Sequence, residues 1–202
     1  MTKAEFAARL NHACAAVTAA EAELTEIDSK FGDADHGLTM TKIAGAISAA
    51  VDDADGGIQS MLDDAAMAVM SLNGGSAVPL WNTWLDGMQE DAPDSEEIDI
   101  DGIQASFSKA FEEIDDMSGA KVGDKTMMDA LIPASEAIAA YEGDSEDELF
   151  AAAAKAAAEG AENSKNFVSK FGRAKSYGTK TIGTPDAGAT SMACFFRGLA
   201  QA

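Results

Sequence analysis

The sequence predicts an all-α fold. Apolar residues recur at helical spacing through most of the 202 residues, and no run alternates apolar and polar residues as a half-buried strand does. The intervals between these patterns are short and rich in Gly, Asp, Ser or Pro, the residues that end helices and form turns. We therefore expect one domain over residues 1–202, built from eight helices, without an internal repeat or a linker.

The composition argues against several classes of protein. Hydrophobic residues make up 47% of the chain and charged residues 24%, as in a globular domain. A net charge of −21 argues against binding to nucleic acid, whose phosphates are bound by Lys and Arg, and against docking on an anionic membrane. The N-terminus lacks the apolar core of a signal peptide and no apolar run is long enough to span a bilayer, so we expect a cytoplasmic protein. Cys14 and Cys194 lie in helical patterns and predict buried thiols, not a disulfide framework.

The first half of the chain predicts four helices. We expect them over residues 2–27, 37–51, 58–72 and 79–88. Thr2 and Glu5 have the spacing of a capping box, which marks the start of the first helix. Trp81 and Trp84 are three residues apart in the fourth helix, so both are expected to face the core.

The second half predicts four more helices after a polar connection. We expect them over residues 103–114, 124–138, 146–170 and 192–199. Residues 86–102 contain eight acids and Pro93, which favours a solvated connection. Asp124 is expected to cap the sixth helix, and Ser145 with Glu148 to form a capping box at the seventh. Residues 172–191 are expected to be a loop.

The stretch between the first two helices concentrates chemistry-bearing side chains. Residues 28–37 read Asp-Ser-Lys-Phe-Gly-Asp-Ala-Asp-His-Gly and include the carboxylates of Asp28, Asp33 and Asp35. Converging carboxylates repel one another unless a hard cation lies among them. Magnesium takes oxygen ligands and is often shared between carboxylates and substrate phosphates. The stretch therefore predicts a metal site, although a chain with 35 acids can also form such a cluster as a solvated turn.

The same stretch offers contacts for phosphate. His36 can donate a hydrogen bond from a ring nitrogen, and Gly32 and Gly37 allow a positive φ or a close approach to a ligand. If residues 35–37 form the first turn of the second helix, its free N–H groups point at the same anion. The turn Asn-Gly-Gly-Ser that ends at Ser76 is a second candidate phosphate cradle, although ordinary helices are joined in the same way.

Three separated stretches resemble the nucleotide-binding L subunit, or domain, of dihydroxyacetone kinases. They are residues 32–38 (Gly-Asp-Ala-Asp-His-Gly-Leu), residues 123–127 (Gly-Asp-Lys-Thr-Met), and residues 172–174 (Gly-Arg-Ala) together with residues 182–191. The stretches come from both halves of the chain and follow the order found in that family. The resemblance implies an eight-helix antiparallel barrel with the nucleotide bound at one open end.

The resemblance also implies a role for individual residues. Asp28, Asp33 and Asp35 match the three aspartates that hold two magnesium ions on the nucleotide phosphates in that family. His36 and Arg173 match phosphate contacts, and Met127 matches an adenine contact. The full set of implied contacts to ADP or ATP is His36, Gly37, Leu38, Thr39, Ser76, Ala77, Gly119, Thr126, Met127, Arg173, Asp186, Ala187 and Gly188.

The activity implied by the resemblance is phosphoryl transfer from the bound nucleotide to a small ketose, such as dihydroxyacetone or erythrulose. The ketose would be held by a separate K-type subunit. Two forms of this reaction stay open. ATP could exchange in every turnover, or ADP could stay bound as a cofactor and be rephosphorylated by a phosphoprotein of a phosphotransferase system.

Four positions depart from the pattern of the family. Thr39 stands in place of a phosphate-binding Asn, and Ala187 in place of a Pro. The run Ser-Ala-Val at residues 76–78 replaces Ala-Ser-Gly, and Gly119 matches the adenine-side glycine only after a shift of one residue. These departures motivate an alternative hypothesis, a non-catalytic nucleotide-binding regulator or adaptor. A third hypothesis is an acidic helical bundle without a ligand.

Overall fold

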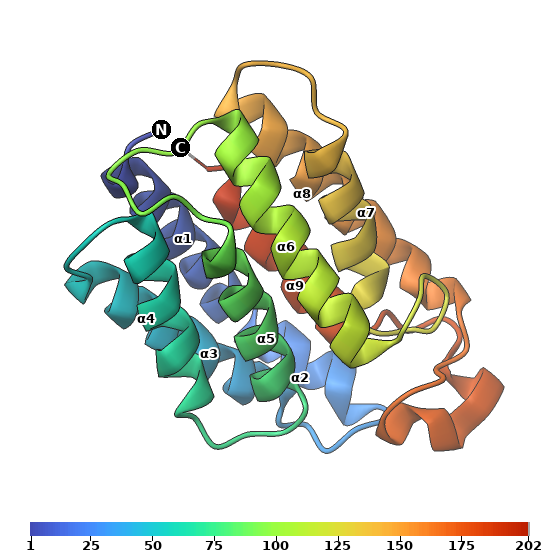
Figure 1. The fold of residues 1–202 in the computed structure, drawn as a ribbon. Helices are drawn as coiled ribbons and strands as arrows, with labels where there is room; N and C mark the ends of the chain where they lie inside the picture. The colour runs from blue at the N-terminus through green and yellow to red at the C-terminus, as the bar shows by residue number, and fades with distance from the viewer. Residues whose placement is uncertain (202) are drawn as a thin grey trace.

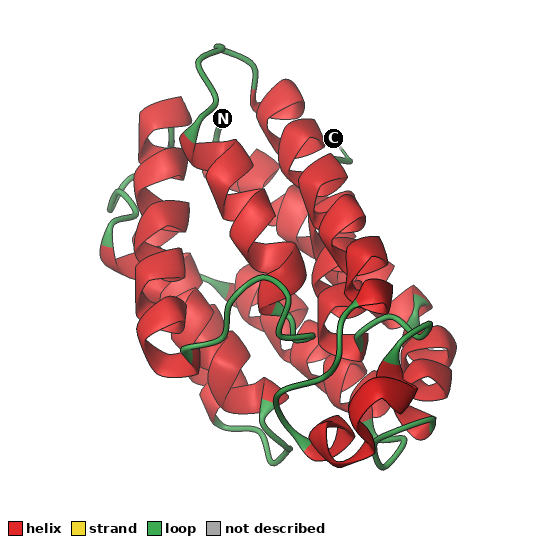
Figure 2. Cartoon of the chain, turned by 90° about the vertical axis from the view of Figure 1, so that its right-hand side faces the viewer, coloured by secondary structure: helices red, strands yellow, loops and turns green. Residues whose placement is uncertain are grey.

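The computed structural model describes residues 1–201, which form nine α-helices and two 3₁₀ segments. In chain order these are α1 (Lys3–Ala19), α2 (Glu21–Ser29), α3 (His36–Asp53), α4 (Ile58–Met70), α5 (Ala77–Glu90), α6 (Ile100–Ser118), α7 (Met128–Ala139), α8 (Glu146–Asn163), η1 (Ser164–Asn166), η2 (Arg173–Thr181) and α9 (Ala187–Leu199). Figure 2 shows no strand in the described chain. Within residues 1–201 the only β-structure is an isolated bridge between Thr2 and Glu97. The predicted all-α fold is confirmed.

Eight of the helices pack side by side in a closed ring (Figure 1). Helix α1 packs on α3, each helix from α3 to α8 packs on the next one, and α9 packs on both α8 and α1. The short helix α2 packs on α3 and α9. Because connected neighbours run in opposite directions, α3, α5, α7 and α9 begin at one end, which we call the cavity end. Helices α1, α4, α6 and α8 begin at the other, the terminal end.

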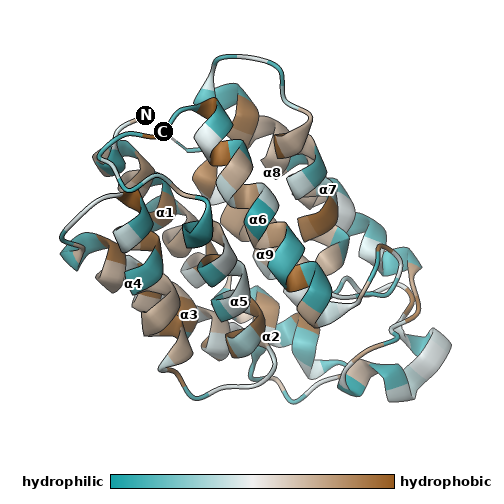
Figure 3. Cartoon of the chain, in the orientation of Figure 1, coloured by the Kyte–Doolittle hydropathy of each residue, from teal (hydrophilic) through white to brown (hydrophobic). Residues whose placement is uncertain are grey.

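Aromatic side chains fill the interior of the ring. The ring of Trp84 lies between 5.4 and 6.1 Å, centroid to centroid, from those of Trp81, Phe107, Phe195 and Phe196. All four pairs meet edge to face, the arrangement that aromatic quadrupoles favour. Hydrophobic residues recur along each helix of the ring and alternate with polar ones (Figure 3). The expected burial of both tryptophans is therefore confirmed.

The two cysteines also follow the prediction. Cys14 and Cys194 are both buried and free, as expected for thiols inside helices.

Across residues 1–201, no helix combines the length and the apolar character that crossing a bilayer requires.

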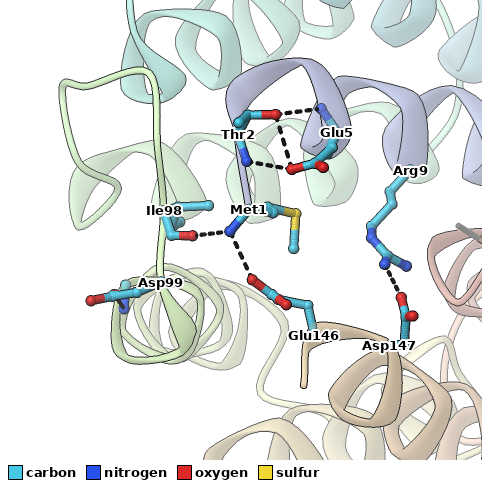
Figure 4. Close-up of polar contacts among 9 residues, drawn as sticks. Met1, Thr2, Glu5, Arg9, Ile98, Asp99, Glu146 and Asp147 are labelled. Atoms are coloured by element: carbon cyan, nitrogen blue, oxygen red, sulfur yellow. Dashed lines mark hydrogen bonds and ion pairs between the residues drawn. The ribbon is translucent and has the colours of Figure 1, made fainter. Parts of the chain in front are cut away.

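The terminal end is fixed by polar contacts around the first residues (Figure 4). The amino group of Met1 donates hydrogen bonds to the carbonyl of Ile98 and to Glu146 Oε1, each at 2.7 Å. Thr2 and Glu5 form the predicted capping box, because the side chain of each accepts the backbone N–H of the other. These contacts join the start of α1 to the starts of α6 and α8.

Arg9 adds a buried cation near the terminal end (Figure 4). Its guanidinium donates to the carbonyl of Leu199 at 2.9 Å and pairs with Asp147. The guanidinium carbon also lies 5.3 Å from the centroid of the Phe150 ring, within cation–π range. One side chain thus ties together α1, α8 and the last turn of α9.

Some predicted boundaries were wrong. The first helix divides at Ala20, just after Thr18 donates its hydroxyl to the carbonyl of Cys14 at 2.9 Å, a bond that bends helices. Helix α5 runs to residue 90 and α6 starts at residue 100, so the polar connection is shorter than residues 86–102. Helix α8 ends at residue 163, where the side chain of Ser164 bonds to the carbonyl of Ala161.

The prediction of a loop over residues 172–191 was also wrong in large part. Residues 173–181 form η2, which is kinked at Gly178 with φ 56° and ψ −132°. Helix α9 begins at residue 187, because the side chain of Asp186 accepts the N–H of Ala189 at 2.9 Å and so caps the helix.

Candidate functional site

A cavity of about 660 Å³ opens at the cavity end of the ring. This volume is typical of sites for small molecules. The first residues of four helices line it, His36 of α3, Ala77 of α5, Met128 of α7 and Ala187 of α9. The start of a helix carries a partial positive charge and unpaired N–H groups. The antiparallel ring therefore brings four anion-attracting helix ends to one cavity.

Three of these four helices begin without a side-chain cap. Over residues 1–201, the residues that precede α3, α5 and α7, namely Asp35, Ser76 and Met127, accept no N–H of their helix through a side chain. Only α9 is capped, by Asp186. A missing cap leaves N–H donors available to water or to a ligand, unless another group accepts them. In α3 the N–H of His36 donates to Asp28, and in α7 the N–H of Met128 donates to Thr126 Oγ1 at 3.2 Å.

The three predicted metal ligands converge at the rim of the cavity. Asp28 belongs to the last turn of α2, and Asp33 and Asp35 belong to the loop that leads to α3. One carboxylate oxygen from each lies within 4.8 Å of the other two. Asp28 is half-buried and the other two are exposed. Oxygen donors in this number suit magnesium, so the residues fit the metal that the sequence predicts, and its binding stays a prediction.

Local contacts explain the shape of this loop. Asp28 Oδ2 accepts the backbone N–H groups of Asp35 at 3.2 Å and His36 at 3.4 Å, which folds the loop back on α2. A Cβ at Gly32 would lie 1.9 Å from Asp28 Oδ1. Gly32 therefore makes room for the carboxylate, and it does not have the positive φ that was one of the two expected reasons. The positive φ falls on Ala34, at 60°.

Gly37 serves helix packing. A Cβ there would lie 2.2 Å from the carbonyl oxygen of Glu21 and 2.2 Å from Thr25 Oγ1, so the glycine lets α3 approach α2. Gly37, Leu38 and Gly119 are the three predicted nucleotide contacts that do not line the cavity. The other ten predicted contacts do: His36, Thr39, Ser76, Ala77, Thr126, Met127, Arg173, Asp186, Ala187 and Gly188.

The His36 ring links the start of α3 to the start of α9. Its Nε2 lies 3.2 Å from the hydroxyl of Ser191, which itself donates to the carbonyl of Gly188 at 2.9 Å. Because the Ser191 proton is used in this way, the hydroxyl oxygen accepts from Nε2 of the ring. Burial lowers the pKa of His36, which favours the neutral imidazole.

Arg173 lies against the carboxylates. It is the first residue of η2, and its guanidinium pairs with Asp33. The rings of Phe31 and Tyr177 meet edge to face at 5.2 Å and join the same two segments. The fold therefore brings the predicted phosphate contact next to a predicted metal ligand, although 140 residues separate them in the sequence.

Asp124 does not cap α7, which corrects the prediction. Its carboxylate accepts the N–H of Lys121 at 2.8 Å and pairs with Lys170 at 2.5 Å, and the hydrogen bond from Lys170 is the main reason why the pKa of Asp124 is lowered. Asp129, inside the first turn of α7, accepts the N–H of Thr126 at 2.7 Å. It holds the turn that leads into the helix.

Lys125 is a cavity residue that the sequence analysis missed. Its side chain is buried and lines the cavity, and its φ is 60°. Its ammonium donates to the carbonyl of Ser164 at 2.6 Å and to the carbonyl of Thr184. Burial lowers the pKa of Lys125. The lysine of the Gly-Asp-Lys-Thr-Met motif was the available signal, and its role depends on carbonyls far away in the sequence.

Asp186 lines the cavity at the start of α9. Its backbone N–H donates to the Ser164 hydroxyl at 2.8 Å, and its side chain caps α9. Burial raises the pKa of Asp186 to about 7. An ionisable group with such a shift beside a cavity is a common property of functional sites.

Comparison with known proteins identifies relatives of this chain. The family model described as the DAK2 domain matches residues 30–201. A D-erythrulose kinase of Mycolicibacterium smegmatis is 35% identical over 191 residues, which cover 92% of this chain and 33% of the kinase. An L-erythrulose kinase of Pectobacterium atrosepticum is 36% identical over 200 residues, covering 93% of this chain and 32% of the kinase. The chain thus spans about a third of the length of these two relatives.

A shorter relative matches over nearly its full length. The ADP-binding subunit DhaL of the PEP-dependent dihydroxyacetone kinase of Escherichia coli is 29% identical over 196 residues, covering 94% of this chain and 92% of the subunit. Among solved structures, the dihydroxyacetone kinase from C. freundii in complex with AMP-PNP and Mg²⁺ superposes with a TM-score of 0.73 at 22% identity. That match covers 98% of this chain and 34% of the other and supports the fold. The resemblance inferred from the sequence is confirmed.

Proposed function

The chain belongs to the DAK2-domain family, and from this premise we propose that it binds ADP or ATP with magnesium and supplies a phosphoryl group to a small ketose. One observation carries the proposal. Asp28, Asp33 and Asp35 converge at the rim of a cavity that is walled by four helix N-termini. Carboxylates suit magnesium and helix N-termini suit phosphates, and a nucleotide bound through magnesium needs both.

Each part of the wall would then have its own role. The three aspartates would hold magnesium, predicted as two ions, which neutralises charge on the phosphate oxygens when bound. The N–H groups at the uncapped starts of α3 and α5 would donate to phosphate oxygens, beside the side chains of Thr39 and Ser76. Arg173 has a planar guanidinium suited to a bidentate phosphate contact. Met127 would lie against adenine, since thioethers pack well on aromatic rings.

We further propose that the ketose is held by a separate K-type subunit or domain. The erythrulose kinases are about three times as long as this chain, and the Escherichia coli relative of similar length is named as a subunit. The acceptor would approach the cavity end from outside, where the phosphates would lie. Dihydroxyacetone and erythrulose are the candidate ketoses, because the names of the relatives contain them.

Calorimetric titration with ADP tests the binding step. We expect binding that requires magnesium, that is abolished by a chelator, and that weakens about 10- to 100-fold or more in Asp33→Ala, as for lost metal coordination. Asp53→Ala removes an exposed carboxylate at the other end of α3 and should leave the affinity unchanged. The proposal fails if the wild-type chain binds no nucleotide, or if Asp33→Ala binds as tightly as the wild type.

The two forms of the reaction can be separated on the purified chain. If ADP is a standing cofactor, nucleotide should remain bound through gel filtration and should be phosphorylated by a phosphoprotein of a phosphotransferase system. If ATP exchanges in each turnover, the chain should lose nucleotide on the column and should need free ATP.

A non-catalytic nucleotide-binding regulator is the second candidate function. Thr39 and Ser76 both line the cavity, and both differ from the pattern of the family at phosphate-binding positions. These differences favour weaker binding of the nucleotide phosphates. Addition of a K-type subunit and dihydroxyacetone or erythrulose to the ATP-loaded chain distinguishes the two. Formation of the ketose phosphate would exclude the regulator, whereas tight binding without transfer would favour it.

A further inference from the structure

One segment carries a charge opposite to that of the rest of the chain. Residues 163–185 contain five basic residues and no acidic residue, whereas the whole chain has a net charge of −21. The five are Lys165, Lys170, Arg173, Lys175 and Lys180. We call residues 163–185 the basic strap. The strap carries +5, so the remaining residues together carry −26.

The basic strap runs along the mouth of the cavity. Phe171, Arg173 and Pro185 line the cavity itself, and Tyr177 packs edge to face on Phe31 of the loop after α2. In Figure 1 the strap contains the orange helical turns that project from the bundle at the lower right, close to the blue loop that follows α2. Any molecule that enters the cavity from this side therefore passes the strap.

Two lysines of the strap form no ion pair within residues 1–201. The other three basic side chains pair with the carboxylates of Glu162, Asp124 and Asp33. In the described part of the chain, residues 1–201, Lys175 and Lys180 have no ion pair, and both are exposed. Neither lines the cavity, so neither is positioned to contact a ligand bound inside.

A nucleotide that approaches this protein meets an unfavourable long-range field, because its phosphates and the protein are both negative. Local clusters of the opposite sign focus the potential and can raise association rates by about 10- to 1,000-fold. We propose that the basic strap captures the nucleotide, in that Lys175 and Lys180 attract its phosphate chain and direct it into the cavity. This inference rests on the proposed function, since it assumes that the cavity binds a nucleotide.

The position of the two lysines determines which rate constant they influence. Charges that act on the approaching nucleotide but do not touch the bound one change the association rate constant and leave the dissociation rate constant alone. The effect must also decline with salt, because the Debye length falls from about 30 Å at 0.01 M to about 3 Å at 1 M.

Stopped-flow fluorescence with a methylanthraniloyl derivative of ADP and magnesium tests the proposal. The test variant is Lys175→Glu/Lys180→Glu. The control variant, Lys155→Glu/Arg197→Glu, makes the same change of four charges at exposed residues in the middle of α8 and near the far end of α9. At low ionic strength we expect an association rate constant at least about fivefold lower in the test variant, within the range of steering effects, and within about twofold of wild type in the control.

The other outcomes are equally decisive. The dissociation rate constants should agree among the three proteins, and the association rate constants should converge at high salt. The inference is wrong if the two variants slow association equally, which would be an effect of net charge, or if the test variant mainly speeds dissociation, which would mean direct contact. Failure of the wild-type chain to bind the derivative would instead overturn the proposed function. Circular dichroism melting checks that both variants fold.

Discussion

The helix N-termini at the two ends of the ring differ in how they are capped. At the terminal end, α1, α6 and α8 are capped by the side chains of Thr2, Asp99 and Ser145. Helix α4 has no such cap, but the N–H of Ile58 donates to the carbonyl of Ser95 at 2.8 Å. At the cavity end, α3, α5 and α7 begin without a side-chain cap. The terminal end thus satisfies the starts of its helices internally. At the cavity end the N–H of His36 donates to Asp28 and that of Met128 to Thr126 Oγ1, while the starts of α3 and α5 keep further donors for a ligand.

Backbone strain follows the same division. Ala34 and Lys125 are the only non-glycine residues within 1–201 with a positive φ, and both lie at the cavity end, where such a conformation costs about 1–2 kcal/mol. The raised pKa of Asp186 lies at the same end. Unfavourable backbone conformations of this kind are usually found at functional sites. The comparison predicts that mutations at the terminal end reduce stability, and that mutations at the cavity end reduce binding.

The largest effect on stability is expected from Arg9→Met. Methionine keeps the length and packing of the side chain but removes the hydrogen bond to the Leu199 carbonyl and the pair with Asp147. Loss of charge-assisted bonds from a buried cation should lower the free energy of unfolding by about 2–3 kcal/mol. Thermal melting should then show a decrease in Tm of about 4–12 °C for a chain of this size.

The control for this variant is Arg197→Met, at an exposed arginine of α9, which should change the free energy of unfolding by less than about 0.5 kcal/mol. Magnesium-dependent ADP affinity, measured well below the transition, should be unchanged in both variants. A large loss of affinity in Arg9→Met would show that the two ends are coupled and would contradict the comparison.

Lys125→Met tests a residue that should contribute both to stability and to nucleotide binding. Its ammonium joins the turn before α7 to the carbonyls of Ser164 and Thr184. Its removal leaves the Thr184 carbonyl without this donor and the Ser164 carbonyl with the Phe167 N–H alone, and it loosens two walls of the cavity. We expect a loss of stability of about 1–3 kcal/mol together with an ADP affinity about 10-fold lower, because a misplaced wall disrupts the bound geometry.

The neighbouring variant Lys121→Met is the matched control for Lys125→Met. Lys121 is exposed and pairs only with Asp115 at the surface, and such pairs contribute about 0–1 kcal/mol. Calorimetry and melting on both variants should show changes in Lys125→Met alone. If ADP affinity stays at the wild-type value in Lys125→Met, the lysine is a purely structural residue.

Gly32→Ala should reduce binding with little effect on stability. The new Cβ would lie 1.9 Å from Asp28 Oδ1 and must push that carboxylate away from the other two. The loop is exposed and can shift, so we expect a Tm within about 2 °C of wild type and an apparent affinity for magnesium and ADP about 10-fold lower. Gly45→Ala is the control, since a Cβ there meets nothing within 4 Å. It should stabilise α3 by about 0.5–1 kcal/mol without changing affinity.

The helices could be predicted from the sequence because their signals are local. Apolar periodicity and turn residues placed every helix of the ring, and the capping spacing of Thr2 and Glu5 marked a true start. The end of α8 was missed because the Ser164 hydroxyl, besides donating to the nearby carbonyl of Ala161, accepts the N–H of Asp186 across the fold. Periodicity cannot report a contact of this kind.

Prediction of the candidate site was also limited to contacts between residues close together in the sequence. The convergence of Asp28, Asp33 and Asp35 could be predicted because the three lie within eight residues of one another. The reason for Gly32 was not predicted, since the space that it leaves is needed only once the Asp28 carboxylate is in place. Lys125 was missed because its partners lie 39 and 59 residues away in the sequence.

The smallest predicted effect concerns pH and Asp186. The pKa of its carboxyl is raised to about 7 in the folded chain, against about 3.9 for an unperturbed Asp. Between these values the folded state holds a proton that the unfolded state has released. The stability contributed by this group is therefore fully present below about pH 4 and is lost as the pH rises through about 7.

Asp186→Asn isolates this contribution, because an Asn side chain can still accept the Ala189 N–H and cap α9 but cannot titrate. The wild type and the variant should melt at similar temperatures at pH 4, and at pH 8 the variant should melt higher by about 2–4 °C, which corresponds to about 1 kcal/mol. The effect is smaller than the full pKa shift implies, because Asp186 is only half-buried and solvent screens its charge. Parallel Tm profiles from pH 4 to 8 would mean that the Asp186 carboxyl is solvated and titrates normally. In that case the cavity wall at the start of α9 would be as open to water as the carboxylate rim.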